Sequence, residues 1–168
     1  MKILIYLLAS STLLLKIPDT IDNQTLTHFF LDNQHNIRAI NDKGEELLVT
    51  ETGNASELQI SSNGKTVTWR KNNRRQNSEN QGSSDSEIFV YRNRKIGLIR
   101  CEPQIRDYWF WHEGEEIAID CGGEHFSGRE ILYDSTTLFQ LENFDQAEIP
   151  PDKRPKWSKS GDNFSEEK

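Results

Sequence analysis

Two short segments in the second half of the chain contain residue types that could bind a metal ion or transfer protons. The first, His112-Glu-Gly-Glu-Glu116, partly matches the zinc-binding pattern His-Glu-x-x-His. Its fifth residue is a glutamate rather than a histidine, and its glycine indicates a turn. Two ligands four residues apart converge on one metal only when they share a helix face, so a zinc site of that type is excluded.

The second segment, Asp120-Cys-Gly-Gly-Glu-His125, places carboxylate, thiol and imidazole groups in one loop. The weak metal-ligand candidates of the chain are therefore His112, Asp120, Glu124 and His125. Together they would suit a small metal-assisted hydrolase. The alternative is structural: the two glycines supply backbone freedom for a link between hairpins, and His125 closes that link with a hydrogen bond. We expect the structural role.

Other catalytic and cofactor signatures do not occur in the sequence. A nucleophile elbow requires Gly-x-Ser-x-Gly, and the nearest segment, Phe126-Ser-Gly128, lacks the leading glycine. Phosphate-binding glycine-rich loops are also missing. We therefore predict no catalytic residue, no cofactor and no enzyme activity.

The segment from Lys71 to Ser86 has no strongly apolar residue and is predicted to be a solvated loop. Arg74 and Arg75 contribute to a small basic patch there. The net charge of −7 and the lack of interleaved aromatic residues argue against a nucleic-acid partner. Long loops that interrupt tight meanders often bind other proteins, which makes Arg74 and Arg75 interface candidates. Residues 71–86 could equally insert into an enzyme cleft, as an inhibitor or immunity protein does.

The N-terminal residues 1–20 fit a secretory leader. Lys2 precedes an apolar run of 13 residues from Ile3 to Leu15. A helix needs about 20 residues to span a hydrocarbon core of ~30 Å, so this run is too short for a stable membrane span. We predict an exported protein, periplasmic or secreted, with no membrane span after leader cleavage. The alternatives are a buried first strand of a cytosolic domain and an uncleaved anchor.

Export changes the interpretation of the two cysteines, Cys101 and Cys121. In an oxidising compartment two cysteines usually pair, and each of these ends an apolar strand-like segment. We expect a disulfide between them that links neighbouring structural units. In a cytosolic protein they would instead be two small buried thiols.

A hairpin pattern recurs along the chain and predicts the elements that position these residues. Asp107 to Cys121 has an aromatic run, a turn at Gly114 and an alternating apolar strand. The same frame occurs in Leu58 to Trp69, where Gly64 matches Gly114, and begins again in Pro155 to Phe164. A second pattern, strand, polar turn and strand, lies between these hairpins and starts at Ile37, Glu87 and Arg129.

The repeat unit is therefore two hairpins in about 40 to 50 residues, which is the period of propeller blades. An ordinary antiparallel meander would show turns at a similar spacing. Three units are fewer than the four to eight blades of a closed propeller. The sequence predicts an all-β protein, an open, incomplete propeller-like stack of about three antiparallel four-stranded or three-stranded sheets. We expect one domain over residues 21–160 and a disordered tail over 161–168.

The turn in Ile60-Ser-Ser-Asn-Gly-Lys-Thr-Val-Thr-Trp69 resembles the Ser-Pro-Asp-Gly-Lys turn of TolB-type and WD-repeat propeller blades. Ser62 stands where those families often have proline. Tyr133-Asp134 resembles their strand-ending aspartate, and Pro155 to Ser158 resembles the start of a further blade. The region from about 55 to 160 is similar to small bacterial secreted proteins with such repeats. This resemblance implies kinship of fold and brings no known active site.

The aromatic run contains the remaining interface candidates, Trp109 and Trp111. Consecutive strand residues face opposite sides, so part of the run must leave the main core face and be covered by a neighbouring sheet or by a partner. We predict a non-enzymatic exported scaffold that binds another envelope or secreted protein, or a second copy as a homodimer. An open stack leaves sheet edges that a partner can cover.

Overall fold

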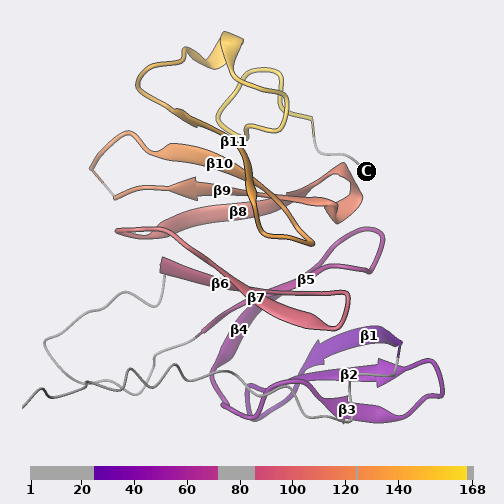
Figure 1. Cartoon of the computed structure of the whole chain (residues 1–168). Helices are drawn as coiled ribbons and strands as arrows, with labels where there is room; N and C mark the ends of the chain where they lie inside the picture. Colours follow the sequence, from indigo (N-terminus) through magenta and orange to yellow (C-terminus); the bar gives the residue numbers. More distant parts are fainter. Residues whose placement is uncertain (1–24, 72–85, 124, 166–168) are drawn as a thin grey trace, which may run out of the picture.

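The computed structural model describes residues 25–71, 86–123 and 125–165 as eleven β-strands in three antiparallel sheets. The sheets lie one above another, and the chain passes through them in sequence order (Figure 1). Over these residues the structure has no α-helix, so none is long and apolar enough to cross a membrane. The all-β prediction of an unclosed stack of three sheets is confirmed.

The first sheet has three strands in the order β1-β2-β3, namely β1(Leu26–Leu31), β2(Ile37–Asn41) and β3(Glu46–Leu48). Asp32 shapes the turn after β1, because its Oδ1 accepts hydrogen bonds from the backbone N–H groups of Gln34 at 2.8 Å and Asn36 at 2.9 Å. Its other oxygen pairs with Arg38 Nε at 2.7 Å. The hydrogen bond from Arg38 lowers the pKa of Asp32 to about 2.

The second and third sheets have four strands each and share one layout. The second has the order β4-β5-β6-β7 and the third the order β8-β9-β10-β11, so that in both each strand pairs with the next in sequence. Their bounds are β4(Ala55–Ile60), β5(Val67–Lys71), β6(Glu87–Arg92), β7(Lys95–Arg100), β8(Ile105–Trp111), β9(Glu116–Cys121), β10(Arg129–Asp134) and β11(Gln140–Asp145).

The predicted repeat register is present in these two sheets. Gly64 lies in the turn between β4 and β5, and Gly114 lies in the matching turn between β8 and β9. Both adopt positive φ angles, +70° and +92°, a region that glycine enters without the steric penalty of a Cβ. The second pattern forms the hairpins β2–β3, β6–β7 and β10–β11.

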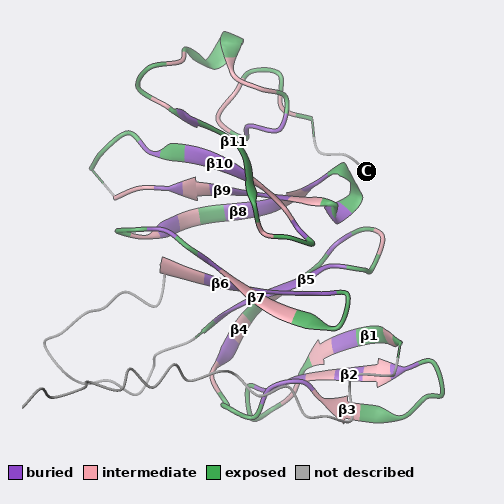
Figure 2. Ribbon diagram, viewed as in Figure 1, coloured by how far each residue is buried: buried purple, intermediate pink, exposed green. Residues whose placement is uncertain are grey.

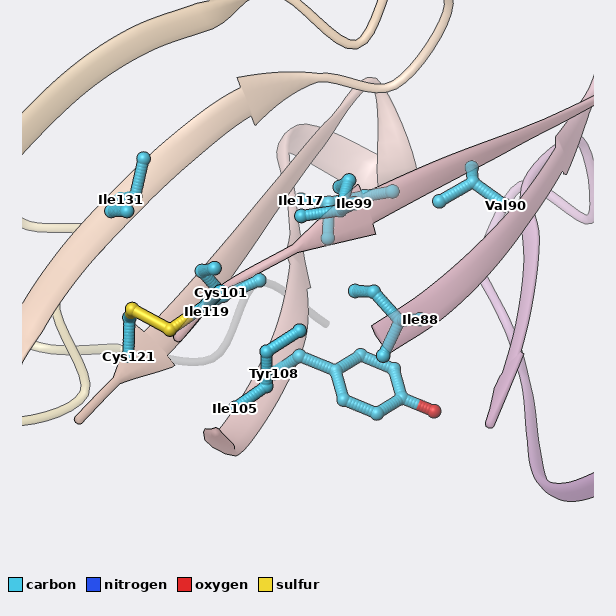
Figure 3. Packing of buried hydrophobic residues seen from close by; sticks show 10 residues of the cluster. All are labelled: Ile88, Val90, Ile99, Cys101, Ile105, Tyr108, Ile117, Ile119, Cys121 and Ile131. Atoms are coloured by element: carbon cyan, nitrogen blue, oxygen red, sulfur yellow. A yellow bond between two sulfur atoms is a disulfide. The ribbon is translucent and has the colours of Figure 1, made fainter. Parts of the chain in front are cut away.

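Two apolar layers hold the three sheets together, one at each junction. Their residues are buried, and buried parts of the ribbon are purple in Figure 2. Phe29, Ile37 and Ala39 of the first sheet pack with Val67, Trp69 and Phe89 of the second. The layer between the second and third sheets is mainly aliphatic (Figure 3) and comprises Ile88, Val90, Ile99, Cys101, Ile105, Tyr108, Ile117, Ile119, Cys121 and Ile131.

The third expected hairpin, Pro155 to Phe164, is not a hairpin. This segment forms turns, after a short 3-10 helix at Pro151–Lys153. Its backbone closes successive turns, through hydrogen bonds from the N–H groups of Ser158, Gly161 and Phe164 to the carbonyl oxygens three residues earlier. The segment instead covers the outer face of the third sheet (yellow in Figure 1). Phe164, within the range expected to be a tail, packs there.

Candidate functional site

The structure separates the metal-ligand candidates. His112 lies in the turn before β9 and contacts Glu116 at 3.1 Å, whereas Asp120 lies at the far end of that strand. A strand rises about 3.3 Å per residue, so the two side chains are held well apart. His125 is exposed in the loop after β9, and Glu124 lies outside the described residues. Among the residues that the structure describes, no three of His, Cys, Asp and Glu form a metal site.

Asp120 is engaged by Arg106 instead. The Arg106 guanidinium donates to both carboxylate oxygens, from Nε at 3.1 Å and from Nη2 at 2.6 Å. A Cβ at Gly128 would lie 1.9 Å from Arg106 Nη2, so this ion pair fits only against a glycine backbone. The ion pair therefore joins β8 and β9 to the loop that precedes β10.

Gln146 extends this polar cluster to the buried carboxylate of Glu130, which was not among the predicted site residues. Its Oε1 accepts from Arg106 Nη2 at 2.9 Å, and its Nε2 donates to Glu130 Oε1 at 2.9 Å. Ser160 donates its hydroxyl proton to the same Glu130 oxygen. Glu130 directly opposes Asp120 across the β9–β10 ladder. The cluster thus fastens the C-terminal segment to the sheet.

Cys101 and Cys121 form a disulfide, as expected. It joins the residue that follows β7 to the end of β9, with a Cα–Cα distance of 5.8 Å, and so links the second sheet to the third (Figure 3). Both cysteines are buried within the aliphatic layer. The bridge is a covalent tie between neighbouring structural units.

Trp109 and Trp111 are covered by the chain itself. They are only 6% and 7% exposed. Trp109 Nε1 donates to the carbonyl oxygen of Trp157 at 2.8 Å, and the Phe164 ring lies 6.3 Å from each tryptophan ring, centroid to centroid. The C-terminal segment therefore shields these two tryptophans from solvent, and no partner protein is needed to cover them. The other two interface candidates, Arg74 and Arg75, lie outside the described residues.

A hollow of about 280 Å³ opens beside this covered face, between β4, β8 and the C-terminal segment. Its charged groups pair with each other: Lys159 Nζ lies 2.8 Å from Asp107 Oδ2 and 5.0 Å from the centre of the Trp109 ring. Because the two charges neutralise each other, the hollow presents no strong preference for a charged ligand.

The carbonyl oxygen of Gly114 is the centre of a second polar cluster, between the second and third sheets. It accepts three hydrogen bonds, from Thr66 Oγ1 at 2.8 Å, Arg92 Nη1 at 2.9 Å and Ser135 Oγ at 2.8 Å. Arg92 also donates from Nη2 to Glu115, and this hydrogen bond lowers the pKa of the Glu115 carboxyl.

The large exposed apolar side chains gather partly at one edge strand. Phe139, which immediately precedes β11, is 74% exposed, and Leu141 on β11 is 52% exposed. Within the described part of the chain, β11 pairs only with β10. Its outer edge therefore offers backbone hydrogen-bonding groups next to two apolar side chains and the exposed carboxylates of Glu142 and Asp145.

No family model matches the chain, and no curated protein matches it. Among solved structures, the chain is similar to the β-propeller domain of the Trilobed protease from Pyrococcus furiosus, with 18% identity, a TM-score of 0.44, and 70% of this chain and 37% of that chain covered. It is also similar to the acylaminoacyl peptidase from Pyrococcus horikoshii, with 12% identity, a TM-score of 0.41, and 76% and 26% covered. The chain thus spans well under half the length of those proteins. The similarity to propeller domains is distant.

Proposed function

We propose that the protein is a non-enzymatic, exported protein-binding module that uses the outer edge of β11. The proposal depends mainly on the exposure of Phe139 and Leu141 at an edge strand. An extended segment of a partner would add to the sheet through main-chain hydrogen bonds, and the two apolar side chains would be removed from water. The disulfide between Cys101 and Cys121 supports the proposed export, because such bonds persist in oxidising compartments.

The charge of the edge narrows the class of partner. Glu142 and Asp145 are exposed on β11, in a chain with a net charge of −7. A strand that alternates apolar and basic side chains complements this edge, whereas a second copy of β11 would bring the same carboxylates together. The proposed partner is therefore another envelope or secreted protein rather than a homodimer. Kinship with TolB-type and WD-repeat blades is part of the proposal and is supported by the Ser61 to Lys65 turn.

Site-specific photo-crosslinking in the producing cells tests the proposal. A photoreactive residue at position 141 should give an adduct of defined mass that is absent when the same residue replaces exposed Lys43 in the first sheet. The crosslinked protein, once identified and purified, should bind the wild-type chain and lose affinity for the Phe139→Ser/Leu141→Ser variant. Equal adducts from both positions, or equal affinity for both chains, would refute the β11 assignment.

A further inference from the structure

A second hollow, of about 190 Å³, lies between the β6–β7 hairpin of the second sheet and the β10–β11 turn of the third. Arg92 and Lys95 line one side of it, and the hydroxyl-bearing residues Ser135, Thr136 and Thr137 line the other. Pockets for drug-sized ligands start at about 300 Å³, so this hollow suits a small ligand. Basic groups opposite hydroxyl donors are the chemistry that recognises an oxyanion.

Arg92 provides a hydrogen-bond donor that the fold itself does not use. Its side chain is buried, with the residue only 8% exposed, and its Nη atoms bind Thr66, Gly114 and Glu115. Its Nε–H has no hydrogen-bond partner. A buried donor left without a partner is costly, and an anion in the hollow would satisfy it.

The hydroxyl side of the hollow is held in place by Leu138. This residue has a φ of +57°, a left-handed conformation that is unfavourable for a leucine. Its side chain rests on Gly97 of β7, where a Cβ would lie 2.3 Å from Leu138 Cδ1. The strained backbone and the glycine together bring the turn at 135–137 against the basic hairpin. Strain of this kind persists where the surrounding structure requires it, and it is frequent at binding sites.

The charges at this end of the two sheets are less negative than those of the chain as a whole. The carboxylates of Glu115 and Asp134 are already engaged, Glu115 by Arg92 and Asp134 Oδ1 by the N–H groups of Thr136 and Thr137. Besides Arg92, three cations add positive charge at these turns, namely Lys65, Arg94 and Lys95. With Glu113 in the β8–β9 turn and Glu116 opposite Asp134, four cations and four carboxylates balance at this end, whereas the chain as a whole has a net charge of −7.

We propose that this hollow binds a phosphate group. The Arg92 Nε–H and the Lys95 ammonium group supply the charge, and the Thr136 hydroxyl supplies a further donor. The phosphate group could be inorganic phosphate or the end of a phosphomonoester. This site is separate from the β11 edge and does not depend on the proposed protein partner.

The test is titration calorimetry of the full chain with inorganic phosphate, at an ionic strength held constant with chloride. We expect saturable binding of one phosphate. Lys95→Gln removes one charged partner of the phosphate. It should weaken binding roughly tenfold, because the loss of one charge-assisted hydrogen bond lowers the binding constant by about that factor. Lys43→Gln removes another exposed lysine, from the β2–β3 turn, and should leave the affinity unchanged.

A further titration distinguishes inorganic phosphate from a phosphomonoester as the ligand. The unfolding midpoint shows whether the lysine variant keeps its fold. Tighter binding of O-phosphoserine than of inorganic phosphate would show that a phosphomonoester is the ligand, and the reverse order would point to the free ion. Because Lys95 is exposed, its variant should keep the wild-type unfolding midpoint. The proposal is wrong if phosphate gives no saturable heat, if acetate binds as tightly, or if both lysine variants weaken binding equally.

Discussion

Gly114 lies so close to Ser61 that a Cβ atom at Gly114 would sit 2.2 Å from the Ser61 Cβ. The two residues belong to matching turns of adjacent sheets, β4–β5 and β8–β9. At Gly64, the glycine that matches Gly114 in the other turn, an added Cβ would meet nothing within 4 Å. Both glycines have positive φ, so they differ in packing rather than in backbone conformation.

Replacement of Gly114 by alanine should therefore destabilise the fold far more than replacement of Gly64. At both positions the positive φ costs about 1 to 2 kcal/mol for a residue with a Cβ. At Gly114 the clash with Ser61 adds overpacking of about 1 to 3 kcal/mol. Urea unfolding followed by tryptophan fluorescence measures the difference. Equal losses for Gly114→Ala and Gly64→Ala would show that the two turns do not contact each other.

The hairpins could be predicted from sequence because their signals are local. Period-two alternation and a glycine at a fixed offset specify β4–β5 and β8–β9 within a dozen residues. The same local pattern misled at Pro155 to Phe164, where a tryptophan and Gly161 fit the frame. There the backbone N–H groups close successive local turns rather than a ladder, and the apolar residues of the segment cover a sheet face.

The polar clusters could not be predicted because their partners are distant in sequence. Gln146 binds Arg106, which is 40 residues away, and Arg92 binds Gly114, which is 22 residues away. The one signal in the sequence was Glu130, a charged residue at the start of an apolar strand. Buried carboxylates need hydrogen-bond partners, but nothing local indicates which residues supply them.

The disulfide should contribute substantially to stability. It closes a loop over a sequence separation of 20 residues, which on the chain-entropy account is worth about 3 kcal/mol. We expect the Cys101→Ser/Cys121→Ser variant to lose about that amount in urea unfolding. Reduction of the wild-type chain should lower its stability to a similar degree and leave the variant unchanged. An equal effect of reductant on both chains would mean that it acts elsewhere.

The C-terminal segment should be required to shield the outer face of the third sheet from water. Trp157 is buried against Phe144, so Trp157→Ala should cost about 3 to 5 kcal/mol. Trp157→Phe keeps an aromatic ring there and should cost less. Acrylamide quenching of the remaining tryptophans should increase in the alanine variant, because Trp109 and Trp111 lose their cover. Unchanged quenching would show that this segment does not shield them.

The loss of folding stability at alkaline pH should depend on Tyr108. Burial raises the pKa of this side chain to about 12 from an ordinary value of 10.0. The tyrosine is neutral when protonated, so between pH 10 and 12 it ionises in the unfolded chain while it stays protonated in the folded one. The raised pKa therefore gives stability that is fully present below pH 10 and is lost as pH rises toward 12, by about 2 to 3 kcal/mol in total.

Comparison with Tyr108→Phe isolates this contribution. Below pH 10 the variant should be less stable than wild type by about 1 kcal/mol, because the Tyr108 hydroxyl donates to the Glu57 carbonyl oxygen at 2.9 Å. Above pH 10 the wild-type free energy of unfolding should fall more steeply, since phenylalanine has no proton to lose. The two curves should converge and then cross. Burial also raises the pKa values of Tyr91 and Tyr133, so the variant retains part of the slope. Parallel curves up to pH 11.5 would contradict a raised pKa at Tyr108.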